Sequence, residues 1–431
     1  MLRQWLDRLR GDKRPQGRRF EPLFELEEFD KLWELPIVRV LAFTGDDERT
    51  GEGHFGPGVG GVLASLLRRD LGFTKQCSVL GGEDTGYLGP NGNDADDAQL
   101  LAFCGDSMYV VVGKVTREEN STLKVRIRVI RRDAPPGYEG KFAVRSTKDQ
   151  LPMLMPSVAA NVCKRLGFSV TDAVARRWRQ HGITNLKDLL RTAVCWENKD
   201  TASLVKLVEA GKTHPDGVVP IDTENPKFRK ASRWALSKAN ELEPDNAQLA
   251  FITFCAVCNF NEESVPPHFE TMLRKGLAST PGHGKSHMVL PHVLDRIPEN
   301  IPYILAHSET GYRFLRGNSF ALSNFSRYLT RFSPKDRRIL PLFLEAIEFD
   351  RQNPSAYEIA IDFFLSQKQP EQALPFAEEL LALCRPPVSE RTMYCFRQAP
   401  AIAEAIDRGD FDPLKHAQDL ANTAKPSCRK Q

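Results

Sequence analysis

Residues 353–387 read NPSAYEIAIDFFLSQKQPEQALPFAEELLALCRPP, and this stretch decides how the second half of the chain is interpreted. Apolar residues recur in it at helical spacing in two runs: Tyr357, Ala360, Ile361 and Phe364, then Ala373, Ala377 and Leu380. Small residues let two helices pack closely, and Pro386 stands where a next unit must turn. The stretch therefore predicts a pair of packed helices that repeats about every 34 residues.

A similar stretch of residues, leading into the first helix of a pair, occurs elsewhere in the sequence. It is seen in ANELEPDNAQLAF (239–251) and EAIEFDRQNPSAYEI (345–359), whose Ala247 and Ala356 lie about three repeat lengths apart. Weaker units fit at about residues 283 and 319. We therefore expect four or five degenerate helical repeats over residues 212–388, followed by capping helices and a tail over 389–431.

Upstream of about residue 171 the pattern changes to alternating strands and helices. Strands are expected at 37–43, 76–80, 109–115, 123–130 and 142–145, and helices at 59–71, 95–103 and 151–166. Gly113, inside a strand, indicates a bulge or a close backbone approach. Residues 36–170 therefore form a predicted α/β domain with a small mixed sheet and flanking helices. A helical connector over 171–211 joins it to the repeats.

Residues 1–35 are basic at first and acidic afterwards. A short amphipathic helix is expected near the start, with its apolar face made by Leu2, Trp5, Leu6 and Leu9. Two interpretations stay open. The helix attaches peripherally to an anionic membrane or a partner, or it frays or docks on the acidic segment that follows.

Composition narrows the class of protein. The chain has 431 residues with 59 Lys and Arg against 56 Asp and Glu, so its net charge of +3 does not predict a global field for nucleic acid. No apolar run approaches the roughly 20 residues that span a bilayer, and the N-terminus lacks the apolar region of a secretory signal. Nine scattered cysteines indicate reduced thiols. We expect a cytoplasmic protein.

Residues 36–170 resemble the TolB-like N-terminal domain, which many bacterial proteins join to tetratricopeptide repeats. RVLAFTGDDERTGEGHFGPGVGGVLASLL (39–67) is similar to that family's first strand, acidic glycine-containing loop and first helix. The closing helix and the strand pair are matched by MLMPSVAANVCKRLGFSV (153–170), LLAFCGDSMYVVVGKV (100–115) and LKVRIRVI (123–130). The resemblance implies a regulatory or signalling protein, and it carries no catalytic residue over.

Gly56, Gly58 and Gly61 spell G-x-G-x-x-G before the predicted helix at 59–71. About a dozen residues separate the motif from the preceding strand and the loop is acidic, which favours a structural glycine-rich connection over a nucleotide site. Ligands nevertheless bind beyond strand ends in open α/β sheets, and the acidic rim suits a small polar or cationic ligand. The candidate residues for this ligand loop are Gly56, Gly58, Glu83 and Asp84.

Two further motifs have competing interpretations. Cys255 and Cys258 with His283 and His287 have the order of a zinc site, but the pairs stand too far apart, and small cysteines suit a helix core. The predicted helices around 181–182 could form a DNA-binding helix-turn-helix, with phosphate contacts from Arg176, Arg177 and Arg179. A solvated basic helix is the preferred interpretation, because acidic residues dilute the charge.

No catalytic triad, paired-carboxylate motif or kinase signature is recognisable in the sequence, so we expect a non-enzymatic protein and predict no cofactor or metal. The leading hypothesis is a scaffold or regulatory protein whose repeat groove binds a peptide or helix of another protein, with the α/β domain as a sensor or second docking surface. Glu358, Asp362 and Ser366 are the candidate groove residues. The alternative is a ligand-sensing or hydrolytic α/β domain with attached repeats.

Overall fold

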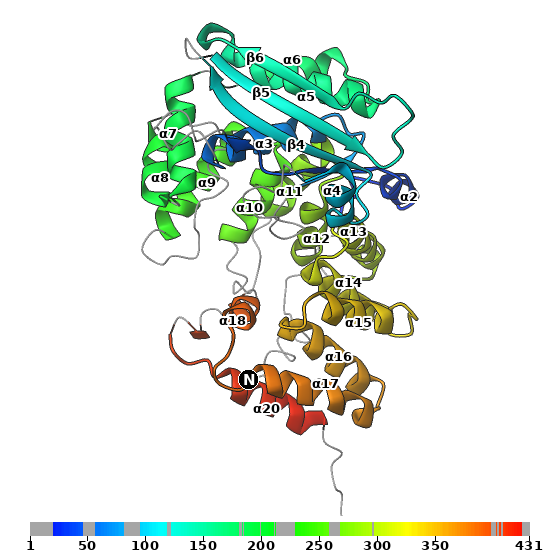
Figure 1. The fold of residues 1–431 in the computed structure, drawn as a ribbon. Coiled ribbons are helices and arrows are strands. Elements are labelled where there is room, and N and C mark those ends of the chain that lie inside the picture. The colour runs from blue at the N-terminus through cyan, green and yellow to red at the C-terminus, as the bar shows by residue number, and fades with distance from the viewer. Residues whose placement is uncertain are drawn as a thin grey trace, which may run out of the picture.

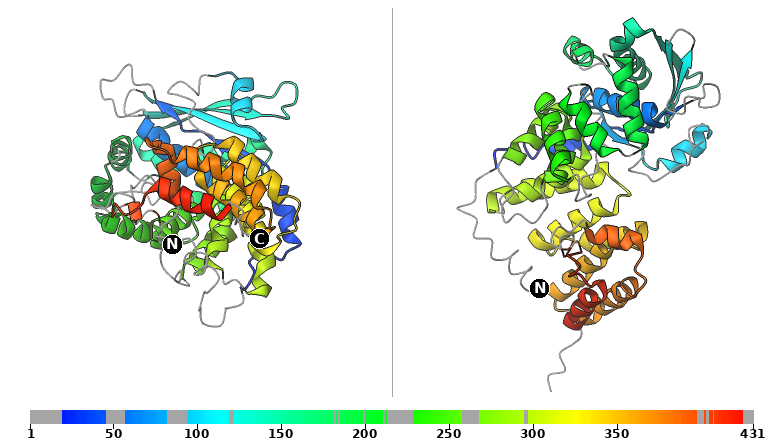
Figure 2. Two further views of the ribbon diagram at one scale, coloured as in Figure 1. Left: turned by 90° about the horizontal axis from the view of Figure 1, so that it is seen from below. Right: turned by 90° about the vertical axis from the view of Figure 1, so that its left-hand side faces the viewer.

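A computed structural model describes most of the 431-residue chain (Figure 1). The described residues are 20–45, 57–81, 95–118, 122–180, 183, 185–198, 200–210, 212, 229–257, 268–294, 297–397, 402, 405, 406 and 408–424. A sheet with its helices occupies one end of the molecule, and successive helices lead away from it toward the C-terminal end (Figures 1 and 2). In the part of the chain so described, no helix is long and apolar enough to cross a membrane.

The sheet is mixed, as the sequence predicts. Its strands are β1 (Ile37–Val40), β2 (Thr44–Gly45), β3 (Ser78–Gly81), β4 (Tyr109–Glu118), β5 (Thr122–Arg131) and β6 (Lys141–Ser146). They lie in the order β3-β1-β4-β5-β6, with β2 paired to β4. β1 runs parallel to β3 and β4, whereas β4, β5 and β6 are antiparallel neighbours. The β4–β5 ladder extends beyond the predicted strands, to the pair Glu118 and Thr122.

Helices cover both faces of this sheet. α3 (Pro57–Gly72) and α5 (Leu154–Leu166), which follows the short helix η4 (Lys148–Met153), bury one face, and α4 (Asp97–Phe103) lies on the other. A Cβ atom on Gly113 would stand 2.6 Å from the Phe43 ring. This close approach is the reason that strand β4 carries a glycine, as the sequence predicts.

The core around the sheet continues past residue 170. Trp178 of α6 (Asp172–Gln180) and Ala193 of α7 (Leu186–Glu197) belong to the same apolar cluster as α3 and the strands. α8 (Thr201–Glu209) and α9 (Arg229–Leu242) follow. Of the segment predicted as a helical connector, α6 and α7 therefore pack on the α/β part, and α8 packs on α9.

The rest of the described chain is helical. The helices are α10 (Ala247–Val257), α11 (His268–Ser279), α12 (Gly284–Val293), α13 (Ile301–Phe314), α14 (Ser319–Phe332), α15 (Ile339–Phe349), α16 (Pro354–Ser366), α17 (Pro370–Leu383), α18 (Glu390–Arg397) and α20 (Pro413–Ala424). The short helix η6 (Pro298–Asn300) precedes α13, and α2 (Glu28–Trp33) packs on α13 from the N-terminal side. We call α10, α12, α14, α16 and α18 the first helices. Each of them contacts the next one along the chain, apart from any contacts outside the described residues.

The first helices begin at regularly spaced capping side chains. The caps are Asn246, His283, Asn318, Asn353 and Ser389, so successive caps stand 35–37 residues apart. Each accepts a hydrogen bond from a backbone N–H two or three residues into its helix, at 3.0–3.2 Å. Such a bond satisfies one of the N–H groups that a helix start leaves without a partner. The period continues through Ser389, so α18 begins where a further first helix is due, just beyond the predicted limit of 388.

Buried polar contacts fix the α/β part to the helical part. The Arg69 guanidinium on α3 bonds Asp70 at 2.8 Å and reaches Glu243, after α9, at 3.2 Å. The Ser78 hydroxyl on β3 donates to the carbonyl of Gly282 at 2.6 Å. All the side chains in these contacts are buried. The two parts therefore share one interface and are not strung on a linker.

Candidate functional site

Equivalent positions on the first helices lie on one partly exposed face of the helical array. The positions lie two, five or six, and nine residues after each cap, and none of them is buried. They are Gln248, Phe251 and Cys255; Lys285, Met288 and His292; Phe320, Asn324 and Arg327; Ser355, Glu358 and Asp362; and Arg391 and Tyr394. We call this set the first-helix face. Because the caps are in register and the first helices are neighbours, the side chains align across the array.

Cations lie beside aromatic rings at two places on the first-helix face. The Lys285 ammonium lies 5.9 Å from the Phe251 ring of the preceding first helix. Arg391 lies 5.8 Å from the Phe320 ring and 5.3 Å from the Tyr394 ring. Arginine and tyrosine are residue types that dominate the energetics of protein interfaces. The composition of this face is suited to binding another protein.

The predicted groove residues Glu358, Asp362 and Ser366 all lie on α16, but the structure gives them different surroundings. Glu358 Oε1 accepts a hydrogen bond from His416 Nε2 of α20 at 2.8 Å. The pKa of His416 is raised: burial alone would lower it, and the bond to Glu358 outweighs burial. Asp362 is half-buried, and the exposed Ser366 donates its hydroxyl to Phe363 O at 2.6 Å. Glu358 is therefore partly covered by the C-terminal helix, with 20% of its side chain exposed, so it lies at the edge of the first-helix face and not in an open groove.

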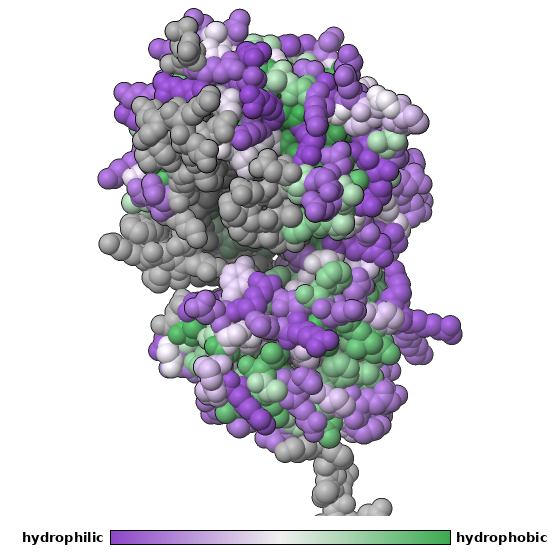
Figure 3. Space-filling view, in the orientation of Figure 1, coloured by the Kyte–Doolittle hydropathy of each residue, from purple (hydrophilic) through white to green (hydrophobic). Residues whose placement is uncertain are grey.

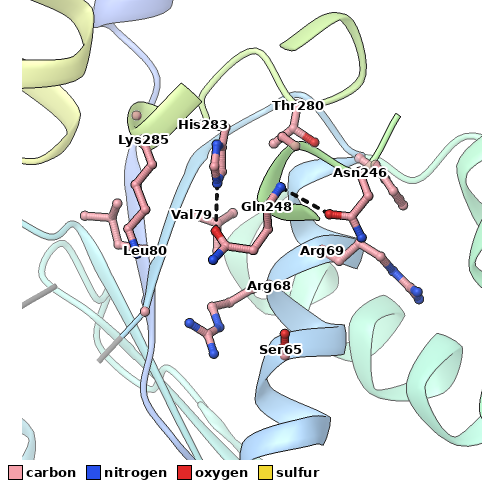
Figure 4. A pocket seen from close by; sticks show the side chains of 14 residues that line it. Ser65, Arg68, Arg69, Val79, Leu80, Asn246, Gln248, Thr280, His283 and Lys285 are labelled. Atoms are coloured by element: carbon pink, nitrogen blue, oxygen red, sulfur yellow. Dashed lines mark hydrogen bonds between the residues drawn. The ribbon is translucent and has the colours of Figure 1, made fainter. Parts of the chain in front are cut away.

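A pocket opens where the first-helix face meets the α/β part (Figure 4). Its walls come from α3, β3 and the starts of α10 and α12. The lining residues are Ser65, Arg68, Arg69, Phe73, Val79, Leu80, Gly81, Asn246, Ala247, Gln248, Thr280, His283, Gly284 and Lys285. We call it the junction pocket. Three of these residues are basic and none is acidic.

His283 orients the Gln248 amide in the junction pocket. His283 Nδ1 accepts the backbone N–H of Ser286 at 3.2 Å, so the proton of the neutral ring is on Nε2. That N–H donates to Gln248 Oε1 at 3.0 Å. The ring is neutral because burial lowers the pKa of His283 to about 3. Gln248 is thereby held with its NH₂ group turned away from His283, on the side of Arg68 (Figure 4).

Only part of the predicted ligand loop can be placed. Gly56, Glu83 and Asp84 lie outside the described residues. Gly58 is the second residue of α3, and a Cβ there would stand 2.2 Å from the Ala193 carbonyl oxygen of α7. The close approach of α7 explains why position 58 is a glycine, and no ligand is needed for that explanation. This agrees with the structural interpretation of the glycine motif.

The two histidines of the possible zinc motif, His283 and His287, form hydrogen bonds with other residues of the chain. His283 bonds Ser286 and Gln248, and His287 bonds His307 Nδ1 and Pro281 O, both at 2.8 Å. Cys258 lies outside the described residues. Among the residues whose placement is given, no three His, Cys, Asp or Glu side chains are grouped to hold a metal ion.

The helix-turn-helix interpretation does not fit the packing. α7, which would have to enter a DNA groove, lies against α3 with Ala193 fully buried. Arg177 stacks over the Phe73 ring at 3.6 Å and pairs with Asp245, whereas Arg176 and Arg179 are exposed. The packing role of Arg177 could not be predicted from the sequence, because Phe73 and Asp245 lie far from it in the chain.

A second surface lies on the sheet face that α4 only partly covers. Its side chains pair across the strands as Lys114 with Arg126, Lys124 with Arg145, and Arg128 with Lys141. Like charges directly opposite each other destabilise a sheet. Glu118 bridges Lys124 and Arg145, and Asp97 pairs with Arg128. We call this surface the basic sheet face.

Apolar surface is concentrated on the lower helices. Figure 3 shows it around α15 and α16, where Leu340, Leu344 and Phe349 of α15 are 40–54% exposed. These residues lie on α15, which is not one of the first helices, so this patch is separate from the first-helix face.

Comparison with known proteins does not assign the chain to a family. No protein-family description matches the chain, and no curated protein matches it.

Proposed function

We propose that this chain is a non-enzymatic scaffold or regulatory protein that holds a segment of another protein on the first-helix face. The observation that carries the proposal is the alignment of five capped helices, which places Lys285 beside the Phe251 ring and Arg391 beside the Phe320 and Tyr394 rings on one face. Stacked helix pairs typically use such surfaces to bind extended peptides or helices.

The finer family assignment belongs to the same proposal. A cap period of 35–37 residues is close to the roughly 34 residues of tetratricopeptide repeats, and small residues Ala360, Ala373 and Ala377 are fully buried in α16 and α17. These features support tetratricopeptide-like repeats. The strand and helix order of the α/β part supports the resemblance to the TolB-like domain.

In this proposal the α/β part supplies a second docking surface. The basic sheet face brings six cationic side chains together across β4, β5 and β6, which favours a role in contacting an anionic partner. The chain would act in the cytoplasm, where free thiols persist. The described cysteines support this, because Cys77, Cys104, Cys163, Cys195, Cys255, Cys384 and Cys395 are all free.

Site-directed photo-crosslinking tests the function. A photoreactive residue replaces Asn324 on the first-helix face of the full chain, and the matched control replaces Glu378, which is exposed on α17. After irradiation in the native host, we expect one protein to attach at position 324 and not at 378. Equal labelling at both positions, or none at 324, would contradict the proposal.

A further inference from the structure

Strand β6 is an open edge of the sheet. It stands last in the order β3-β1-β4-β5-β6, so among the described strands it pairs with β5 alone (Figure 1). Its residues Lys141, Ala143 and Arg145 are exposed. The strand at the other end of the order, β3, instead lies against the helical part, where Ser78 bonds Gly282. β6 is therefore the edge at which a further strand has room to pair.

The register shows which backbone groups face this edge. Val129 N–H donates to Gly140 O at 3.0 Å, and hydrogen-bonded pairs alternate along antiparallel strands. Ala143 and Arg145 lie at the intervening positions, so their backbone N–H and C=O groups point away from β5. No residue of the described chain hydrogen-bonds these outward groups. They form a template for the main-chain bonds of another strand.

One side of this edge is basic. Lys141 and Arg145 project onto the basic sheet face, where Arg145 stands opposite Lys124 of β5. Glu118 pairs with both Lys124 and Arg145, so two cations share one carboxylate. Lys141 has no ion pair with a residue of the described chain. Among these residues the edge carries an excess of positive charge, which acidic side chains would neutralise.

The other side of the edge is apolar. Phe142 and Val144 point to the opposite face of the sheet, where they pack at the border of the core and stay partly exposed. The Arg165 guanidinium of α5 lies 4.2 Å from the Phe142 ring and donates to Lys141 O at 3.3 Å. A strand added to β6 would therefore place one of its faces beside apolar side chains.

We propose that β6 accepts an extended segment of another protein as an antiparallel strand, and that acidic and apolar residues alternate in this segment. The acidic side chains lie beside Lys141 and Arg145, and the apolar ones lie beside Phe142 and Val144. Main-chain hydrogen bonds to Ala143 and Arg145 supply affinity, and the two rows of side chains select the sequence. The inference rests on the α/β part being a second docking surface, and it names the segment that docks there.

The charges at the edge disfavour other occupants. Two copies of β6 paired edge to edge would bring cations opposite cations, which destabilises a sheet. Sheets that bind single-stranded nucleic acid stack its bases on aromatic side chains, whereas β6 presents Lys141, Ala143 and Arg145 on its basic side. An acidic strand satisfies both the outward backbone groups and the excess of positive charge.

Fluorescence anisotropy of the full chain with a labelled short peptide, in which Glu alternates with Val, tests the edge. We expect this peptide to bind, and to bind the double variant Lys141→Glu/Arg145→Glu about tenfold or more weakly. The control Lys335→Glu/Arg385→Glu changes the net charge equally at exposed positions of the helical part and should bind as the parent does. A peptide of the same composition with its Glu residues in one block should also bind about tenfold or more weakly.

Backbone methylation of the peptide tests the strand pairing on the unaltered chain. In an antiparallel pair the residues opposite Ala143 and Arg145 are the acidic ones, and their N–H groups bond β6. Methylating the Glu nitrogens should therefore abolish binding, whereas methylating the Val nitrogens should leave it largely intact. Hydrogen exchange of the Ala143 and Arg145 amides should also slow when the unmodified peptide is bound.

The inference is overturned if the alternating peptide does not bind, if the two double variants bind it equally, or if both methylated peptides behave alike. Binding of a single-stranded oligonucleotide in preference to the peptide would also overturn it and assign the edge to a nucleic acid. Peptide binding at β6 alongside failed crosslinking at position 324 would retain this inference and refute the role of the first-helix face. The reverse pattern would refute the strand pairing alone.

Discussion

The Nδ1 atoms of His287 and His307 lie 2.8 Å apart in the interior of the helical part. His287 Nε2 donates to Pro281 O, so His287 Nδ1 is an acceptor and His307 Nδ1 donates to it. His307 Nε2 then has no hydrogen-bond partner. The rings of Phe24 and Phe29 pack against the pair. Both histidines are therefore neutral in an enclosure that would penalise a charge.

This pair predicts a loss of stability in acid. Burial lowers the pKa of His287 to about 4, and burial, with His287 and Arg274 nearby, lowers that of His307 well below its usual range. In the unfolded chain both titrate near about 6.5. The unfolded state therefore binds more protons below pH 6.5, and the free energy of unfolding should fall as the pH drops from about 6.5 to 4.

Urea unfolding at a series of pH values measures this effect. His307→Leu should unfold more easily at pH 7.5, by about 1–3 kcal/mol, because His287 Nδ1 loses its donor. It should also show a shallower fall in acid. The exposed His268 provides the control His268→Leu. A pH dependence that His307→Leu leaves unchanged would disprove the role of the pair.

The buried contact between Arg69 and Glu243 predicts how firmly the two parts are joined. Glu243→Gln should lower the free energy of unfolding by about 2–4 kcal/mol, because it removes one of two carboxylates that compensate a buried guanidinium. Limited proteolysis should then cut more rapidly between the parts. Glu241→Gln removes an exposed pair with Lys238 and should change little. Equal effects in the two variants would refute the argument.

The capping side chains predict a loss of stability when one of them is removed. Asn353 is fully buried, accepts the Ser355 N–H at 3.1 Å and donates to Ser319 Oγ at 3.2 Å. Asn353→Ala should lower the free energy of unfolding by about 1–2 kcal/mol. Gln372→Ala, at an exposed position of α17, serves as the control in the same urea titration. A loss below about 0.3 kcal/mol for Asn353→Ala would argue against capping as the source of the period.

The basic sheet face predicts a stabilising mutation. Arg126 is exposed and stands directly opposite Lys114, so Arg126→Glu replaces a like-charged pair with an opposite one. The free energy of unfolding should rise by about 0.2–1 kcal/mol. Retention on a heparin column should weaken at the same time. Arg179→Glu, on exposed α6 surface, controls for net charge; a destabilised Arg126→Glu would contradict the repulsion argument.

Local pattern was enough to predict the order of the parts. The alternation of strands and helices before residue 171 matches the observed sheet, and the helical boundaries near Ala247 and Ala356 match the starts of α10 and α16. These features depend on neighbouring residues, which a sequence displays directly.

The site depends on contacts between distant residues, and these were not predictable. The junction pocket joins Arg68 to Lys285, and the coverage of Glu358 comes from His416. The spacing of His283 and His287 suggested a metal motif, whereas the fold uses one as a helix cap and pairs the other with His307. No local pattern encodes such pairings.

The most direct test of the account is the affinity of the crosslinked partner segment for the full chain and two charge-reversal variants. Arg327 lies on the first-helix face, and Arg385 is exposed after α17. Binding measured by fluorescence anisotropy should weaken by about tenfold or more for Arg327→Glu and by less than about twofold for Arg385→Glu. Equal affinities in the parent and both variants would show that the first-helix face is not where the partner binds.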